Sequence, residues 1–210
     1  MGWAIEHLKQ FRRSVFDAKV GVRAHDSLAL VHDVPTLWTT RLTLRAFRDS
    51  DRPPFAELNA DLEVMRHFPA VLSRSESDDL VDRIGGGWSK GFGLWAVERR
   101  DAGAFVGFIG LSEPSWSAHF TPCIEIGWRL SQESWGHGFA TEGADEVLSW
   151  AREHVVFPHD EVVSFTAAGN RRSRRVMEKL GMTRDAAEDF DHPLVTTLSL
   201  RRHVLYRKRM

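Results

Sequence analysis

The sequence predicts a single α/β domain built on a mixed, mostly antiparallel sheet of six or seven strands flanked by helices. A length of 210 residues is usual for one domain. With 42% hydrophobic and 27% charged residues, the chain has the composition of an ordinary globular protein. Short candidate strands follow one another in the first half, which favours antiparallel pairing. Strand and helix alternate in the second half, which favours a parallel strand–helix–strand crossover.

The first half is expected to supply most of the antiparallel strands. Strands are predicted where short apolar runs are bounded by turn residues, at residues 42–46, 93–98, 104–111 and 122–130. A helix is expected to start after Asp49 or Ser50 and to reach about Phe68, since two prolines stand in its first turn. A second helix is expected to open with a capping box of Ser75 and Asp78 and to end at the glycines 85–87.

The second half is expected to contain the parallel crossover. An apolar stripe at helical spacing predicts a helix over about 139–155, and a second helix is expected over about 171–180, ending before Gly181. A strand at 162–167 separates the two helices. Two closing strands are expected near 182–187 and 198–206.

The chain divides into an N-terminal extension, residues 1–36, and a domain, residues 37–210. Apolar residues recur near the start at close to helical spacing: Ile5, Leu8, Phe11 and Val15. They predict a helix that packs on the domain or on a second copy of the chain, as in a homodimer. A net charge of −1 makes a nucleic-acid partner unexpected, and no apolar run is long enough for a membrane span. Charges among the first residues and a single cysteine favour a cytoplasmic location.

A glycine-rich turn between a strand ending at Leu130 and a helix beginning near Phe139 is the main functional signal. Gly136 and Gly138 allow close approach of the main chain, and the helix start offers N–H groups without partners, so the turn suits an anion. A glycine pair alone is more often a tight turn. A nucleoside-triphosphate loop would need Lys-Ser/Thr after the second glycine, but Phe139-Ala140 stand there. A dinucleotide-binding fold would need a third small residue at the position held by Thr141. The remaining interpretation is a loop for the pyrophosphate of coenzyme A.

Three segments carry a resemblance to a known family: Glu125-Ile126-Gly127-Trp128-Arg129-Leu130, Trp135-Gly136-His137-Gly138-Phe139-Ala140-Thr141-Glu142, and Asn170-Arg171-Arg172-Ser173-Arg174-Arg175-Val176-Met177-Glu178-Lys179-Leu180-Gly181-Met182. They resemble the GNAT superfamily of N-acetyltransferases, and most closely its branch that acetylates the N-termini of ribosomal proteins. The resemblance covers about residues 37–207. It implies the GNAT fold, acetyl-CoA as the acetyl donor, no metal, and a primary amine as the acceptor, either a protein N-terminus or a small-molecule amine.

The resemblance also implies which residues bind coenzyme A. They lie on the strand before the turn, in the turn, and at the start of the later helix: Trp128, Leu130, Trp135, Gly136, His137, Gly138, Phe139, Ala140, Thr141, Asn170 and Ser173. The family's loop opens with Arg or Gln at the position held here by Trp135, so phosphate contact is expected to rest on main-chain N–H groups. An arginine cluster at 171–175 could hold the 3′-phosphate or could be a solvated helix face.

Glu125 is the candidate catalytic base, since an amine must lose a proton before it is acetylated. An ion pair with an arginine on a neighbouring strand is an equal alternative; Arg129, on the same face, is about 13 Å away and too far for a direct pair. Ser173 could hydrogen-bond the departing sulfur or only stand in a turn capped by Asn170. The only tyrosine, Tyr206, lies in the last strand and is not expected to act as the acid.

Two further alternatives concern the reaction. Cys123 could carry the acetyl group covalently, but no basic residue flanks it, so packing and direct transfer are expected. The alternative to an enzyme is a non-catalytic acyl-CoA-binding sensor or interaction module that has kept the loop.

Overall fold

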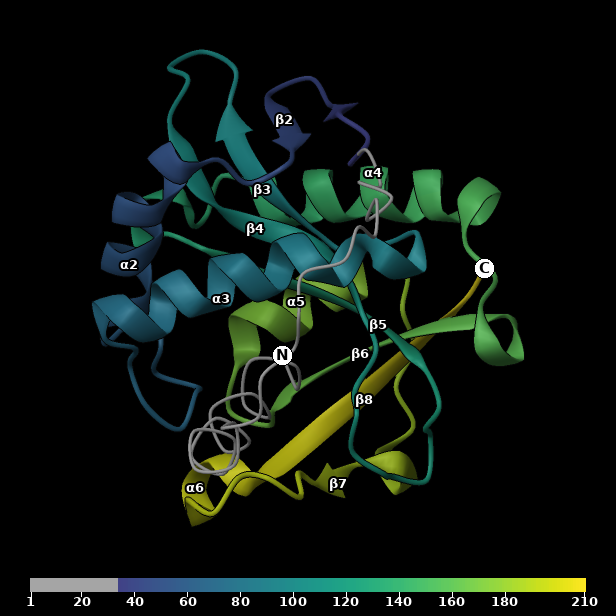
Figure 1. Cartoon of the computed structure of the whole chain (residues 1–210). Helices are drawn as coiled ribbons and strands as arrows, with labels where there is room; N and C mark the ends of the chain where they lie inside the picture. Colours follow the sequence, from purple (N-terminus) through teal and green to yellow (C-terminus); the bar gives the residue numbers. More distant parts are fainter. Residues whose placement is uncertain (1–33) are drawn as a thin grey trace, which may run out of the picture.

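The structure is a computed structural model, and it describes residues 34–210 (Figure 1). The helix expected near the N-terminus, and nearly all of the expected extension, lie outside the described residues. Within the described range, no helix is long and apolar enough to cross a membrane.

Eight strands form one sheet in the order β1-β2-β3-β4-β5-β6-β8-β7. In chain order they are β1 (Leu37–Trp38), β2 (Leu42–Arg45), β3 (Leu94–Arg99), β4 (Phe105–Ser112), β5 (Ile124–Leu130), β6 (Glu161–Ala167), β7 (Phe190–Asp191) and β8 (Arg202–Arg209). The sheet has one strand more than the largest expected number, because β1 and β7 are edge strands of two residues each, too short to leave a pattern in the sequence.

One pair of neighbouring strands, β5 and β6, is parallel, and the others are antiparallel, as expected. The parallel pairing is short. It joins Ile124 to Val162 and Glu125 to Val163, and no pair follows along β5. The two strands therefore separate beyond Glu125 and leave a gap in the middle of the sheet.

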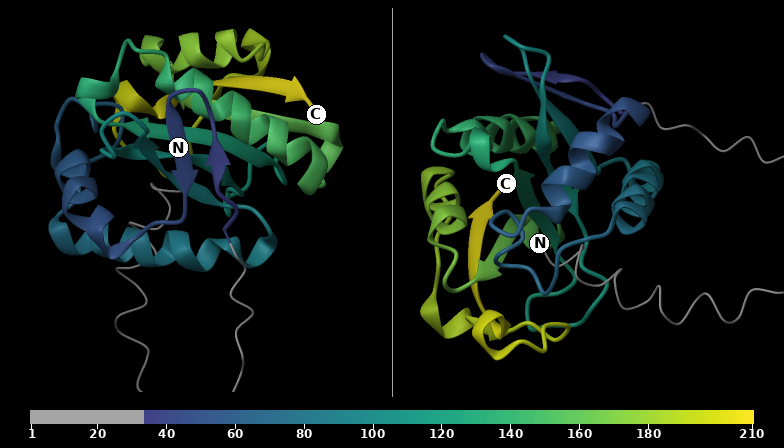
Figure 2. Two further views of the ribbon diagram at one scale, coloured as in Figure 1. Left: turned by 90° about the horizontal axis from the view of Figure 1, so that it is seen from above. Right: turned by 90° about the vertical axis from the view of Figure 1, so that its left-hand side faces the viewer.

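Helices cover both faces of the sheet (Figures 1 and 2). They are α2 (Arg52–Ala60), α3 (Arg74–Gly87), α4 (Phe139–His154), α5 (Arg171–Lys179) and the short α6 (Leu198–Arg201). Five short 3₁₀ turns complete the described elements: η1 (Asp49–Asp51), η2 (Trp88–Lys90), η3 (Gln132–Ser134), η4 (Pro158–Asp160) and η5 (Ala186–Glu188). Helices α4 and α5 pack on one face of the sheet, while α2 and α3 lie against the other.

The start of α3 differs from the expectation. Its N-cap is Ser73, whose Oγ accepts a hydrogen bond from the N–H of Glu76, and the carboxylate of Glu76 accepts one from the N–H of Ser73. The expected pair, Ser75 and Asp78, lies inside the helix, where Asp78 accepts a hydrogen bond from Arg74 at 2.8 Å. The expected end at the glycines is confirmed, because α3 ends at Gly87; the 3₁₀ turn η2 follows, and the chain turns at Gly91, with φ of +83°.

The end of the chain also differs from the expectation. Residues 182–187 form an isolated bridge between Thr183 and Arg207 instead of a strand. The last strand begins at Arg202 and not near residue 198, because Leu198–Arg201 turn as α6.

Apolar side chains form one continuous core on the α4–α5 face and two separate clusters on the other face. The first of these two, which includes Phe55, Phe68 and Phe108, lies under α2 and α3. The second, which includes Trp116 and Phe165, lies over β6 and β8. Arg129, on β5, lies under the first cluster, and Cys123, just before β5, lies within the second, so Glu125 and Gly127 lie between them.

Candidate functional site

The turn between β5 and α4 is built as an anion site. Gly136 and Gly138 have φ of +80° and +82°, a region that other residues enter only with strain. Gly138 is the N-cap of α4 and provides no side-chain cap. Among the described residues, no main-chain N–H from Gly136 to Thr141 donates a hydrogen bond. These donors lie at a helix start on an exposed turn, where they can bind a phosphate group.

Glu142 fixes the start of α4 against the β1–β2 turn. Its Oε1 accepts hydrogen bonds from Thr39 Oγ1 at 2.6 Å and from the N–H of Arg41 at 2.9 Å, and its Oε2 accepts one from Arg41 Nε at 2.7 Å. Burial opposes the charge of Glu142, but these hydrogen bonds outweigh it and lower the pKa of the carboxyl group. No local pattern predicts this contact, since Thr39 and Arg41 lie about a hundred residues before Glu142 in the chain.

Two arginines flank the turn. The guanidinium carbon of Arg41 lies 4.8 Å from the centre of the Phe139 ring, and that of Arg172, from the first turn of α5, lies 4.4 Å from the centre of the Trp135 ring. Trp135 stands where the family pattern has Arg or Gln, and the guanidinium of Arg172, from α5, lies over its ring. Cations are therefore available beside the turn even though its opening position is apolar.

The gap between β5 and β6 leads from this turn into the sheet. The N–H of Ser131 donates to the carbonyl of Val106 on β4, so the main-chain groups of Trp128 and Leu130, at alternate positions, point toward β6. The carbonyl of Leu130 accepts a hydrogen bond from the indole N–H of Trp135 at 2.9 Å. Trp128 lies beyond Glu125, the last residue of β5 that pairs with β6, so its main-chain groups face the gap. Its side chain packs in the α4 core.

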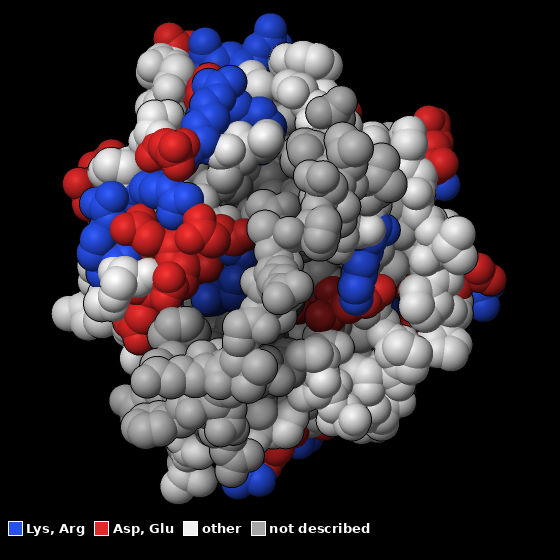
Figure 3. All heavy atoms as spheres, in the orientation of Figure 1, with Lys and Arg blue, Asp and Glu red and all other residues white. Residues whose placement is uncertain are grey.

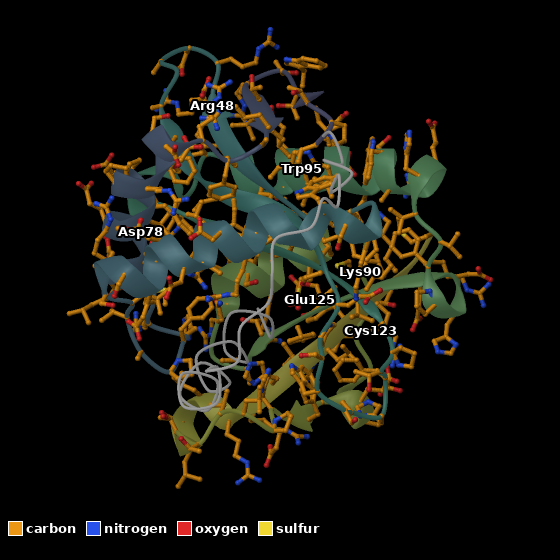
Figure 4. The ribbon with its side chains drawn as sticks, viewed as in Figure 1. Arg48, Asp78, Lys90, Trp95, Cys123 and Glu125 are labelled. Carbon is orange, nitrogen blue, oxygen red and sulfur yellow. The ribbon has the colours of Figure 1, made fainter. Side chains whose placement is uncertain are left out.

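Glu125 is fully buried at the point where β5 and β6 separate. It shares a face of β5 with Cys123, and Figure 4 shows the two residues near each other. Burial and the charge of Glu125 raise the pKa of the Cys123 thiol to about 12. Cys123 lies buried within the apolar cluster of Trp116 and Phe165, and a thiol with a raised pKa is a poor nucleophile at neutral pH.

The start of α5 lies across the gap. Asn170 is the N-cap: its Oδ1 accepts a hydrogen bond from the N–H of Ser173 at 3.3 Å, and its Nδ2 donates to Thr166 Oγ1 at 3.0 Å. Ser173 is 4% exposed, and its Oγ has no hydrogen-bond partner among the described residues. Tyr206 lies in the core and donates to Glu178 at 3.0 Å, so it does not reach the gap.

Other features of the described residues do not compete with this site. A hollow of about 270 Å³ lies between η1, α3 and β3, where Arg52 is already paired with Asp49 and Asp82. On the face that carries α2 and α3, acidic and basic side chains are intermixed (Figure 3), which is typical of a solvated, ion-paired surface. No cluster of His, Cys, Asp and Glu in the described range could hold a metal ion.

A family model places the fold and the turn in a known group. The model described as "Acetyltransferase (GNAT) domain" matches residues 41–183. The chain belongs to the GNAT acetyltransferase family. It is therefore an N-acetyltransferase by family, and the expected GNAT fold is confirmed.

Individual relatives agree. YkkB of Bacillus subtilis, an uncharacterized protein, is 30% identical over 153 residues, which are 70% of this chain and 84% of YkkB. The FsC-acetyl coenzyme A-N(2)-transacetylase of Aspergillus fumigatus is 31% identical over 160 residues, 71% of this chain and 65% of that protein. The solved structure of RimL, a ribosomal L7/L12 α-N-protein acetyltransferase in complex with coenzyme A, is 15% identical with a TM-score of 0.67, covers 84% of this chain and 98% of its own, and shares the fold.

The structure brings two of the expected segments together, because Arg172, in the first turn of α5 that Asn170 caps, contacts Trp135 at the turn. The main chain of Trp128 lies on β5 beyond its last residue paired with β6. Sequence reasoning missed Arg41 because it lies in an ordinary turn between two strands, β1 and β2. It also missed the specific role of Arg172, since only the fold shows which arginine of the cluster reaches Trp135.

Proposed function

We propose that this GNAT protein transfers an acetyl group directly from acetyl-CoA to a primary amine, either a protein N-terminus or a small-molecule amine. The observation that carries the proposal is the set of main-chain N–H groups from Gly136 to Thr141, which donate to nothing within the described residues and stand at the start of α4 beside the gap. The names of two relatives, a coenzyme A-dependent N(2)-transacetylase and an α-N-protein acetyltransferase, support this type of reaction.

The proposed binding site for the donor runs from the turn into the gap. The N–H groups of Gly136, His137, Gly138, Phe139, Ala140 and Thr141 bind the pyrophosphate, and the alanine and glycines keep the approach open. Arg41 and Arg172 add positive charge on either side. The main chain of Trp128 and Leu130 borders the pantetheine arm, with Asn170 and Ser173 across the gap.

Three groups of the chain are proposed to act on the reacting atoms. When bound, acetyl-CoA supplies an acetyl group activated as a thioester. Glu125 accepts the proton that the amine loses while the carbon–nitrogen bond forms and the carbon–sulfur bond breaks. The N–H of Trp128 donates a hydrogen bond to the carbonyl oxygen as negative charge develops there. Ser173 Oγ–H, which has no partner in the described structure, donates to the departing sulfur.

The base is needed because of the amine. A lysine-like amine has a pKa of about 10.4 and an α-amino group about 7.7–8.0, so both are largely protonated at low pH. Glu125→Gln is therefore expected to slow turnover more at low pH than at high pH, where the amine is already neutral. The matched control is Glu153→Gln, on the exposed side of α4.

The experiment measures release of free thiol from acetyl-CoA with a panel of amines, together with the melting temperature with and without acetyl-CoA. Thiol release that depends on an amine, and a pH profile altered in Glu125→Gln but not in Glu153→Gln, are expected. A rise in melting temperature without thiol release would favour the non-catalytic acyl-CoA sensor. Wild-type rates for Glu125→Gln at every pH would remove Glu125 from the reaction.

A further inference from the structure

Arg129 is a buried cation with neutral contacts. It is 4% exposed on the α2–α3 face of β5, and one of its Nη atoms donates to Oδ1 of Asn59. Its guanidinium carbon lies 4.2 Å from the centre of the Phe68 ring and 5.4 Å from that of Phe108. Its Nε has no hydrogen-bond partner among the described residues, and burial lowers its pKa to about 9.

Arg45, the other buried arginine among residues 34–210, shows how this fold stabilises such a charge. It is 6% exposed, and both of its Nη atoms donate to the carboxylate of Asp51, at 2.7 and 2.9 Å. Its Nε donates to Glu98 at 2.9 Å. A buried charge is strongly unfavourable unless an opposite charge accompanies it. No carboxylate within the described residues accompanies Arg129, so a bound molecule is the natural source of its counter-ion.

Gly127 lies between Arg129 and Glu125 on the same face of β5. It is the one residue of β5 that is partly exposed, and it shares a face with Glu125 and Arg129, two residues away on either side. Each neighbour is about 7 Å along the strand, since two strand residues span that length. Having no side chain, Gly127 leaves β5 partly exposed between the buried carboxylate of Glu125 and the buried guanidinium of Arg129, and we call this stretch, Glu125 to Arg129, the floor. This floor lies between the two apolar clusters of that face and beside the gap.

We infer that the acceptor amine carries a carboxylate, which Arg129 binds while the amine lies over Gly127 at Glu125. The inference rests on the proposed function and names its substrate class: a zwitterionic amine such as an amino acid, or a peptide whose first residue is acidic. In this arrangement the carboxylate of the acceptor lies at Arg129 and its amine lies at Glu125, so each charge meets one of opposite sign. Arg129 takes no part in bond making; it binds and orients the acceptor.

The test compares acceptors that differ in the carboxylate alone. The probes are methionine against methioninamide, β-alanine against β-alaninamide, and peptides starting with Asp against peptides starting with Asn. Rates are normalised to the concentration of unprotonated amine, because an amide neighbour changes the amine pKa. The full chain is expected to use the carboxylate member of at least one pair about tenfold better in kcat/KM, as sites built for a polar group reject acceptors that lack it.

Variants locate the preference. Arg129→Met is expected to abolish it by raising KM for the carboxylate acceptor, with the amide acceptor little affected, and Arg129→Lys is expected to keep part of it. The control is Arg152→Met, on the exposed side of α4. If Arg129→Met does not fold, the wild-type comparison and Arg129→Lys decide.

Two outcomes overturn the inference while leaving the acetyltransferase proposal intact. One is equal use of both members of every pair by the wild-type chain. The other is an equal loss for both members in Arg129→Met, which would make Arg129 a residue that only holds Asn59 and Phe68 in place. Absence of thiol release with every amine, despite binding of acetyl-CoA, would refute the proposed function and this inference together.

Discussion

Replacing His192 by phenylalanine is expected to make folding less sensitive to acid. His192 is 1% exposed, and its ring centre lies 4.6 Å from that of Trp116 and 4.9 Å from that of His203, which is 2% exposed. Its Nδ1 accepts a hydrogen bond from the N–H of Leu194, so the neutral ring carries its proton on Nε2. Burial, together with the neighbouring His203, lowers the pKa of His192 to about 3. Burial lowers that of His203 to about 4.

The magnitude follows from these values. Both rings remain neutral in the folded chain down to about pH 4, whereas in the unfolded chain they take up protons below the ordinary pKa of about 6.5. The contribution of the two neutral rings to the free energy of unfolding is therefore fully present above pH 6.5. It is lost as the pH falls from 6.5 toward the lowered pKa values of His192 and His203. One pKa unit between the folded and unfolded chain corresponds to about 1.4 kcal/mol. At pH 5 each histidine should therefore lower the free energy of unfolding by about 2 kcal/mol.

The assay is urea unfolding between pH 7.5 and pH 5. His192→Phe keeps an aromatic ring within the cluster of Trp116, Phe165 and Phe190, and it should lose about 2 kcal/mol less than the wild-type chain over this range. His154→Gln, an exposed position on α4, is the control and should follow the wild type. An identical dependence on pH in His192→Phe and the wild type would refute the reasoning.

Three further predictions concern other parts of the fold. Gly138→Ala should weaken acetyl-CoA binding in calorimetry, because a side chain at its φ of +82° costs about 1 kcal/mol or more, whereas Gly169→Ala, with nothing within 4 Å, should bind normally. Arg45→Met should lower the free energy of unfolding in urea by about 3–5 kcal/mol because it leaves the buried carboxylate of Asp51 without a cation, while Arg74→Met, in an exposed pair, should change it by less than about 1 kcal/mol. With a pKa of about 12, Cys123 should react with iodoacetamide at pH 8 only after unfolding, and rapid labelling of the native chain would contradict its burial.

Local patterns predicted the elements whose signals are short in range. The turn at Gly136 and Gly138 could be read as an anion site because positive φ and a helix start are encoded by a few adjacent residues. Where two local patterns overlap, as at the start of α3, the sequence does not show which of them the helix uses. Ser73 with Glu76 and Ser75 with Asp78 both fit a capping box, and the structure uses the first pair, with Ser77 fully buried on the inner side of α3.

The sequence by itself determined the family, the mixed sheet and the phosphate turn, because these depend on neighbouring residues and on alternation along a strand. The tertiary structure alone decided which side chains complete the site. Arg41, in the β1–β2 turn, and Arg172, in α5, reach the phosphate turn from distant parts of the chain. Arg129 is a buried cation only because α2 and Phe68 fold over β5. Charge, burial and distance between remote residues are properties of packing, and no local pattern of residues records them.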